Sequence, residues 1–166
     1  MTNSLKILID ELAGYILNPK EGLPDDVFYF IGRHTPYINV DLLIKIPGRG
    51  ALLTWREDEH AGLGWHIPGG IIRFKESWEE RINEVGKSEL GIKITSAAGP
   101  IVINQIITES KERSHFISLL FDCKINDESL KIIEESIQKS PYKINFFDFV
   151  PQDFLAIQKI YSDYIS

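Results

Sequence analysis

The chain has 166 residues, a formal net charge of −6, 43% apolar residues and a single cysteine. This length suits one domain with its own core. The acidic balance argues against a nucleic-acid binder that relies on a broad basic face, whereas a small phosphorylated ligand needs only a local cluster of donors. Cys123 alone cannot form an intrachain disulfide and suits a reducing compartment. Its apolar surroundings predict a buried structural thiol.

The N-terminal third of the chain predicts helices first and then a hairpin. Apolar residues repeat at helical spacing until Asn18-Pro19, where the residue before proline avoids helical geometry. The predicted elements are a helix at 5–17, a second helix starting at 24–26, strands at 37–46 and 51–56 joined by a turn at 47–50, and a polar loop at 57–64. No signal-peptide pattern and no run of about 20 apolar residues is present, so we expect a cytoplasmic protein without a membrane span.

The clearest helix of the chain follows a glycine-rich stretch. Gly64-Trp65-His66-Ile67-Pro68-Gly69-Gly70 predicts a tight turn and a short loop. Ser77 and Glu80 match a capping box at the helix start, and Gly91 stands where a left-handed residue usually ends a helix.

One carboxylate in this helix is oddly placed. Trp78, Ile82 and Val85 form an apolar stripe at a 3.6-residue period, and Glu89 is the next position on it. Burying a bare charge costs several kcal/mol. Glu89 is therefore either solvated at the helix end or holds a cation at the edge of a cleft.

The remaining chain predicts mainly strands. They are expected at 92–95, 101–108, 115–125 and 142–150, with an ambiguous segment at 127–138 and a final helix from Pro151 to about Tyr164. Strands around one central helix, with a terminal helix, indicate an α+β or α/β sandwich in which helices cover a mixed sheet.

The spacing from Gly70 resembles the Nudix box, G-x5-E-x7-R-E-U-x-E-E-x-G-U, where U is aliphatic. Glu76, Glu89 and the flanking glycines match this pattern. The other positions differ: the box arginine is Glu84, the next glutamate is Val85, the aliphatic residue is Gly86, and the first of the paired glutamates is Ser88.

The chain further resembles one branch of this superfamily, the GDP-mannose mannosyl hydrolases, which also lack those two glutamates. The similarity includes Leu23-Pro24-Asp25-Asp26-Val27-Phe28, Arg33-His34-Thr35-Pro36, Ala51-Leu52-Leu53-Thr54-Trp55-Arg56 and the segment 146–155. It covers about residues 23–155. The resemblance implies a single Nudix domain over 1–166, with an α/β/α sandwich and a mixed β-sheet, in which residues 1–20 are an added N-terminal helix.

The resemblance also implies a set of site residues. The Gly69 carbonyl and the Glu89 carboxylate would bind Mg²⁺, with Mn²⁺ as the alternative cation. Arg56 would bind the diphosphate, and Asp41 stands where the branch has a sugar-side carboxylate. The nucleotide site would include Leu23, Pro24 and Phe28. Taken alone, Arg56 is typical of a surface strand residue, and Phe28 equally suits the core.

Three features depart from the branch. Its third metal ligand and its base, an adjacent Gln-His, align with Tyr142 and Lys143, so Lys143 is the candidate base only if its pKa is strongly lowered. Glu134, Glu135 and Gln138 are the candidate substitutes. Ile71 replaces a substrate-facing arginine, for which Arg73 is a substitute. The clasp between Glu76 and the box arginine is lost. Glu76, Glu80 and Glu84 instead follow one another at i, i+4 and i+8 and repel one another mildly, unless Arg73, Arg81 or Lys87 bridges them.

Three functions follow from these observations. The first is a Mg²⁺-dependent hydrolase of a nucleoside diphosphate sugar, with GDP-mannose as the first choice, which releases nucleoside diphosphate and sugar. The second is a pyrophosphohydrolase that yields a nucleoside monophosphate and a sugar phosphate. The third is a ligand-binding Nudix domain with little turnover. The expected partners are a small nucleotide sugar and, by family resemblance, a second copy in a homodimer, with no nucleic acid and no membrane.

Overall fold

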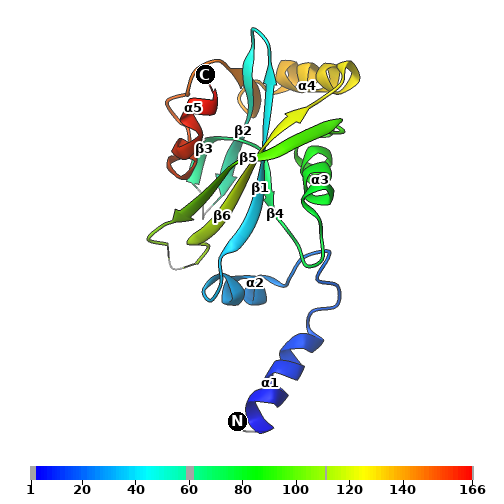
Figure 1. Cartoon of the computed structure of the whole chain (residues 1–166), viewed down its shortest axis with the longest axis vertical. Helices are drawn as coiled ribbons and strands as arrows, with labels where there is room; N and C mark the ends of the chain where they lie inside the picture. The colour runs from blue at the N-terminus through cyan, green and yellow to red at the C-terminus, as the bar shows by residue number, and fades with distance from the viewer. Residues whose placement is uncertain (1–2, 59–61, 111, 166) are drawn as a thin grey trace.

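The structure, a computed structural model, describes residues 3–58, 62–110 and 112–165 (Figure 1). Its helices are α1 (Asn3–Gly14), α2 (Asp25–Gly32), α3 (Trp78–Leu90), α4 (Asp127–Lys139), the 3₁₀ helix η1 (Ala156–Tyr161) and α5 (Ser162–Ile165). Its strands are β1 (Tyr37–Ile46), β2 (Gly50–Asp58), β3 (Gly62–His66), β4 (Gly69–Ile71), β5 (Ser96–Ile107), β6 (His115–Lys124) and β7 (Ile144–Phe147).

These strands form one mixed sheet in the order β3-β2-β1-β6-β5, with β4 added to β1 and β7 added to β2. The β1–β6 pair is parallel and the other strand pairs are antiparallel. The predicted hairpin of β1 and β2 is confirmed, as is the predicted mixed sheet with helices on it.

Two apolar clusters lie on opposite faces of the sheet and give the sandwich its layers. One packs α3 and α4 against the sheet through Ile82, Val85 and Ile133. The other packs the C-terminal η1 and α5 through Tyr161 and Ile165. Figure 1 shows α3 and α4 on one side of the sheet and α5 on the other. The α/β/α arrangement predicted from the sequence is therefore correct.

Local signals set both ends of α3. The Ser77 hydroxyl accepts a hydrogen bond from the Glu80 backbone N–H, and the Glu80 carboxylate accepts one from the Ser77 N–H, as the capping box predicts. Gly91 ends the helix with a φ of 67°, the left-handed conformation that glycine adopts without a Cβ clash. Cys123 is fully buried, as predicted, and burial raises its pKa to about 12.

Several predicted boundaries are wrong. The glycine-rich stretch before α3 forms β3 and β4, and the predicted loop at 57–64 overlaps β2 and β3, with 59–61 outside the described residues. The segment 92–95 is no strand, because β5 begins only at Ser96. The predicted C-terminal α-helix is mostly 3₁₀, and the ambiguous segment is α4.

The predicted N-terminal helix α1 extends away from the body of the protein (Figure 1). It ends at Gly14, before the predicted Asn18-Pro19 stop. In the described parts of the chain, no helix is long and apolar enough to cross a membrane.

Candidate active site

A cavity of about 860 Å³ opens between the N-terminal segment and the sheet. Five predicted site residues line it together: Leu23, Phe28, Asp41, Arg56 and Gly69. They come from the segment before α2, from α2, and from strands β1, β2 and β4. The remaining three, Pro24, Glu89 and Lys143, lie outside the described lining of the cavity.

The strand pair β1–β4 brings Asp41 and Gly69 side by side. The hydrogen bonds between the two strands lie on either side of this pair: Leu42 N–H donates to Pro68 O (2.8 Å), and Ile72 N–H donates to Ile38 O (2.8 Å). In an antiparallel ladder, Asp41 and Gly69 are then a non-hydrogen-bonded pair, so the Gly69 N–H and C=O point away from β1. The approach is close: a Cβ on Gly69 would lie 2.4 Å from Asp41 Oδ1 and 2.6 Å from the Val40 carbonyl oxygen.

Asp41 is a buried carboxyl held by a network of donors. Its Oδ2 accepts hydrogen bonds from Tyr161 Oη (2.8 Å), Asn39 Nδ2 (3.1 Å) and the Ser118 hydroxyl, and Tyr161 Oη also donates to Ser118 Oγ (2.7 Å). Burial raises the pKa of Asp41, while the donors from Ser118, Tyr161, Asn39 and Gln158 lower it. The net direction is upward, so this carboxyl binds a proton more tightly than an exposed aspartate.

Two residues of this wall were not predicted as site residues. Gln158, from η1, accepts a hydrogen bond from the Ile67 N–H (2.9 Å) and hydrogen-bonds Asp41, so it fixes the strand connection before Gly69. Ser118 reaches the site because β6 runs parallel to β1. Nothing in the local sequence marks either residue. His66 also lines the cavity, with Nδ1 2.8 Å from Ile67 O and Nε2 3.1 Å from Thr54 Oγ1.

Glu89 lies near this wall at the end of α3. Its side chain remains open to solvent, yet the surrounding protein removes enough water that burial raises its pKa to about 7. The guanidinium of Arg56 and the Gly69 backbone lower this pKa, and the charge of Asp41 raises it. The Arg56 guanidinium, the Gly69 backbone and the Asp41 charge thus all act on the Glu89 carboxyl.

The donor set here fits a hard divalent cation that is held only partly by protein. Within the described ranges, no three His, Cys, Asp or Glu side chains stand close enough to share a metal ion. Mg²⁺ usually takes one or two carboxylates and keeps several waters or substrate phosphate oxygens. Glu89 supplies an accessible carboxylate, and the Gly69 carbonyl points away from its β1 ladder partner.

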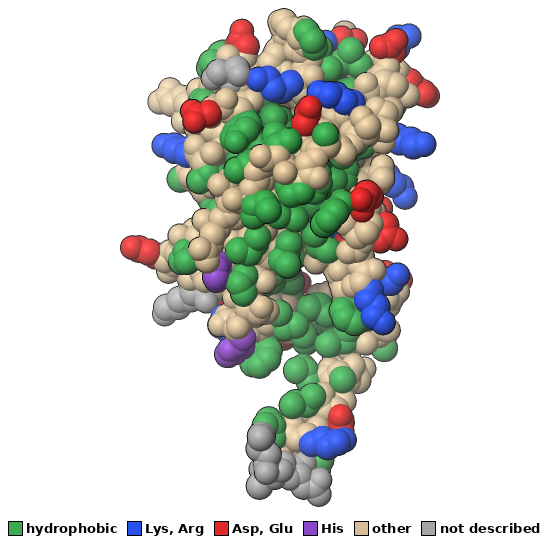
Figure 2. Space-filling model, in the orientation of Figure 1, with side chains coloured by type: hydrophobic (Ala, Val, Ile, Leu, Met, Phe, Trp, Pro, Cys, Tyr) green, Lys and Arg blue, Asp and Glu red, His purple; other side chains and the backbone are tan. Residues whose placement is uncertain are grey.

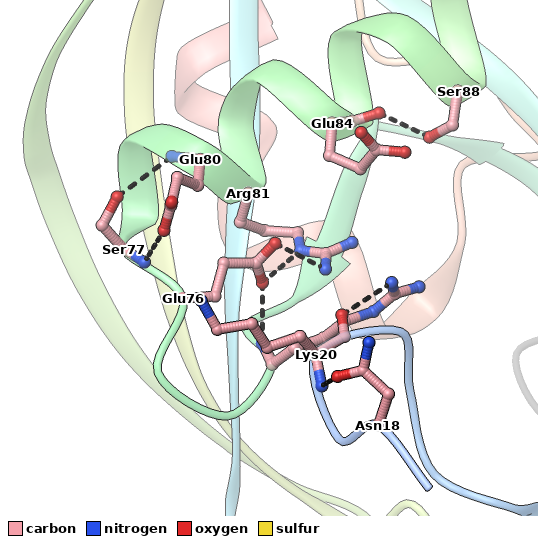
Figure 3. Close-up of polar contacts among 9 residues, drawn as sticks. Asn18, Lys20, Glu76, Ser77, Glu80, Arg81, Glu84 and Ser88 are labelled. Atoms are coloured by element: carbon pink, nitrogen blue, oxygen red, sulfur yellow. Dashed lines mark hydrogen bonds and ion pairs between the residues drawn. The ribbon is translucent and has the colours of Figure 1, made fainter.

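The clasp on Glu76 is present, contrary to the expectation that it is lost. Arg81 takes the place of the box arginine: its Nε donates to Glu76 Oε2 and its Nη2 to Glu76 Oε1, both at 2.8 Å (Figure 3). The two side chains are only 8% and 14% exposed. Glu76 also accepts the Arg73 backbone N–H (2.8 Å), which ties the β4–α3 loop to the helix. Arg81, one of the three residues proposed to bridge the glutamates, therefore pairs with Glu76.

The candidate base, Lys143, and the candidate third ligands, Glu134, Glu135 and Gln138, are not among the residues that line the described cavity. The exposed Lys143 is fixed through its backbone, since Trp55 N–H donates to Lys143 O (2.7 Å). Glu134 pairs with Arg49 Nη1 (2.5 Å) at the β1–β2 turn. The roles proposed for Lys143, Glu134, Glu135 and Gln138 remain predictions.

The other end of the cavity is aromatic. The ring of Phe28 stacks on Tyr37, with centroids 4.6 Å apart, and the Arg113 guanidinium lies 5.9 Å from the Phe28 centroid. Arg73, proposed as a substitute for the missing arginine, lines the cavity and donates from Nη1 to the Lys20 carbonyl (3.1 Å). The cavity therefore joins an apolar, aromatic end to a charged end.

Comparison with known proteins supports this fold. No protein-family model matches the chain. The low-salt glycan biosynthesis protein Agl8 of Haloferax volcanii is 30% identical over 118 residues, which are 69% of this chain and 75% of that protein. A MutT Nudix hydrolase structure from Burkholderia pseudomallei aligns with a TM-score of 0.58 at 16% identity, over 80% of this chain and 100% of that chain.

The chain has the fold of this Nudix hydrolase structure. It belongs to the same family as Agl8.

Proposed function

We propose that the protein is a Mg²⁺-dependent Nudix hydrolase of a nucleoside diphosphate sugar, with a GDP-mannose-type substrate as the first choice. The observation that carries this proposal is the cavity of about 860 Å³ that joins the Leu23–Phe28 end to Arg56, Asp41 and Gly69. Ligand pockets typically measure about 300–1,000 Å³. The name of the relative Agl8, a glycan biosynthesis protein, agrees with a sugar nucleotide.

The two ends of the cavity suit the two ends of such a substrate. Leu23, Pro24 and Phe28 offer an apolar surface to the nucleoside, although Pro24 itself lies outside the described lining. Arg56 offers its planar guanidinium to the diphosphate, where two parallel hydrogen bonds are available. Gly69 and Glu89 would hold Mg²⁺, which neutralises diphosphate charge when bound.

The proposed reaction is displacement of nucleoside diphosphate from the anomeric carbon by water. A carbon–oxygen bond forms to water, the bond from the anomeric carbon to the diphosphate breaks, and the diphosphate leaves with the electron pair. Asp41 lines the cavity, and its raised pKa suits acceptance of the proton from water. This makes Asp41 a better base candidate than Lys143, which lies outside the described lining.

A binding domain with little turnover is the second candidate. The observation in its favour is that Glu89 is not joined by two further metal-ligating side chains among the residues described. The products of incubation with GDP-mannose and Mg²⁺ separate the candidates. GDP and free mannose support the proposal, GMP and mannose 1-phosphate indicate pyrophosphohydrolysis, and no turnover across a nucleotide-sugar panel with retained thermal stabilisation by ligand indicates a binding domain.

Two variants on one helix test the metal assignment. Glu89→Gln is expected to lower the Mg²⁺-dependent rate at least about 100-fold, the usual scale for loss of a charge-stabilising group. Glu84→Gln makes the same chemical change at an exposed position of α3 and is expected to leave the rate unchanged. Equal rates in the two variants would refute the role of Glu89.

A further inference from the structure

Two apolar surfaces of the chain are exposed to solvent and are not packed against other described parts of the protein. The first is α1, whose apolar side chains stand free of the body of the protein: Leu5, Ile7, Leu8, Ile9 and Leu12, with Leu8 61% exposed. The helix is apolar enough to favour burial, since each buried leucine or isoleucine side chain gains from leaving water.

The second surface is the part of the sheet next to α3. Ile103 pairs with Leu119 across β5 and β6, and Ile38 pairs with Ile117 across β1 and β6. Leu119 belongs to the cluster beneath α3, so these side chains share its face. Yet Ile103 is 62% exposed and Ile107 is 69% exposed. Figure 2 shows hydrophobic side chains gathered over β5 and β6 on the drawn face, where no helix covers them.

The total surface is too large for a compact monomer. A folded 19.0 kDa chain is expected to expose about 8,400 Å². This chain exposes 10,300 Å², about 1,900 Å² more. A specific interface of standard size covers about 800 Å² on each partner. The excess is large enough to supply one such interface.

The connection to the body holds α1 away from its own sheet. Asn18 and Glu21 close a turn, with Glu21 N–H donating to Asn18 O (3.0 Å) and Asn18 Nδ2 donating to Glu21 Oε1 (2.7 Å). The Lys20 carbonyl of this turn accepts a hydrogen bond from Arg73 Nη1 (3.1 Å), in the loop between β4 and α3. From this anchored turn, α1 extends outward (Figure 1).

We propose that two copies of the chain form a symmetric dimer in which α1 of each copy packs on the β5–β6 face of the other. A two-fold axis repeats this contact, so both apolar surfaces of both copies are covered. A membrane is the weaker partner for α1, because interfacial helices are rich in Lys and Arg, whereas α1 carries Lys6 with Asp10 and Glu11. The proposal does not depend on the proposed enzymatic activity.

The dimer is tested by light scattering after size exclusion at about 20 μM, where the proposal predicts twice the 19.0 kDa chain mass. Leu8→Glu and Ile103→Glu each place a charge in the interface and are expected to weaken the dimer at least about 100-fold. Leu63→Glu, at a 68% exposed position on β3, is the matched control and should stay dimeric. Circular dichroism identifies any variant that fails to fold.

Cross-linking tests the contact without a charge. A mixture of Leu8→Cys and Ile103→Cys chains, treated with a short bismaleimide, should give a two-chain product that contains one of each; the buried Cys123 does not react. A monomeric wild-type chain would overturn the proposal. A dimer that persists in the Ile103→Glu variant would also overturn the proposal, because it would indicate contact between α1 helices alone. A monomer that sediments with anionic vesicles would overturn it as well.

Discussion

Replacing Arg81 with methionine is expected to lower the free energy of unfolding by about 3–5 kcal/mol. Arg81 and Glu76 are nearly buried, at 8% and 14% exposure, and join through two hydrogen bonds of 2.8 Å. Removal of one partner leaves the other charge buried and unpaired, which costs far more than loss of a surface pair. Methionine keeps most of the aliphatic volume of arginine, so the loss reports on the charge.

Urea denaturation measures this effect. With an m-value of about 2 kcal/mol/M, the midpoint should fall by about 1.5–2.5 M. The control is Lys124→Met, which breaks the exposed pair with Asp122 (2.7 Å) and is expected to cost less than about 1 kcal/mol. The double variant Glu76→Gln/Arg81→Met removes both charges and should be more stable than Arg81→Met alone.

A third variant tests where the arginine must stand. Glu84→Arg, added to Arg81→Met, restores arginine at the family position one turn further along α3, and it should recover part of the lost stability. If the free energy of unfolding of Arg81→Met lies within about 1 kcal/mol of the wild-type value, as expected for Lys124→Met, the Arg81–Glu76 pair does not hold the β4–α3 loop and the prediction is wrong.

Three further predictions concern the site and the core. Gly69→Ala should lower stability by about 1–3 kcal/mol, because the added Cβ meets Asp41 Oδ1 at 2.4 Å; thermal unfolding measures the loss, and an unchanged melting temperature would contradict it. The pKa of Glu89 rises from 4.5 to about 7 on folding, so its protonation stabilises the native state at low pH and this contribution is lost as pH rises from 4.5 to 7. Without Mg²⁺, Glu89→Gln should therefore gain stability relative to the wild type across that range, whereas Mg²⁺ at pH 7.5 should stabilise the wild type alone; parallel pH curves would refute the shift. Cys123 is fully buried with a pKa raised to about 12, so a thiol reagent should react with it only after unfolding, and fast labelling of the native chain would count against its burial.

The parts of the fold that were predicted correctly from the sequence are those determined by residues close together in the chain. The capping box and Gly91 mark the two ends of α3. The run of β-branched and apolar residues in β1 differs clearly in composition from the turn at 47–50 that follows it. Strands β3 and β4 were missed because they are short and rich in glycine, and β4 has only three residues. β5 was predicted too short because Gly99-Pro100 interrupts its pattern at a register shift on the edge of the sheet, where proline is tolerated.

The site shows the same division between local and distant information. The motif placed Gly69 and Glu89 on the chain, but the donors to Asp41 come from Ser118 and Tyr161, 77 and 120 residues further on. Only the parallel β1–β6 pairing and the return of η1 to the sheet bring them together. A motif read along the chain carries no information about such partners.

The altered box separates two tasks that one helix performs. The structural task, holding the β4–α3 loop, passes from the box arginine position to Arg81, because a guanidinium one turn earlier on α3 still reaches Glu76. The chemical task is the one proposed for Glu89, because the end of α3 brings this carboxylate to the Gly69 backbone and Arg56. Replacement is therefore tolerated where a side chain only has to reach its partner from the helix.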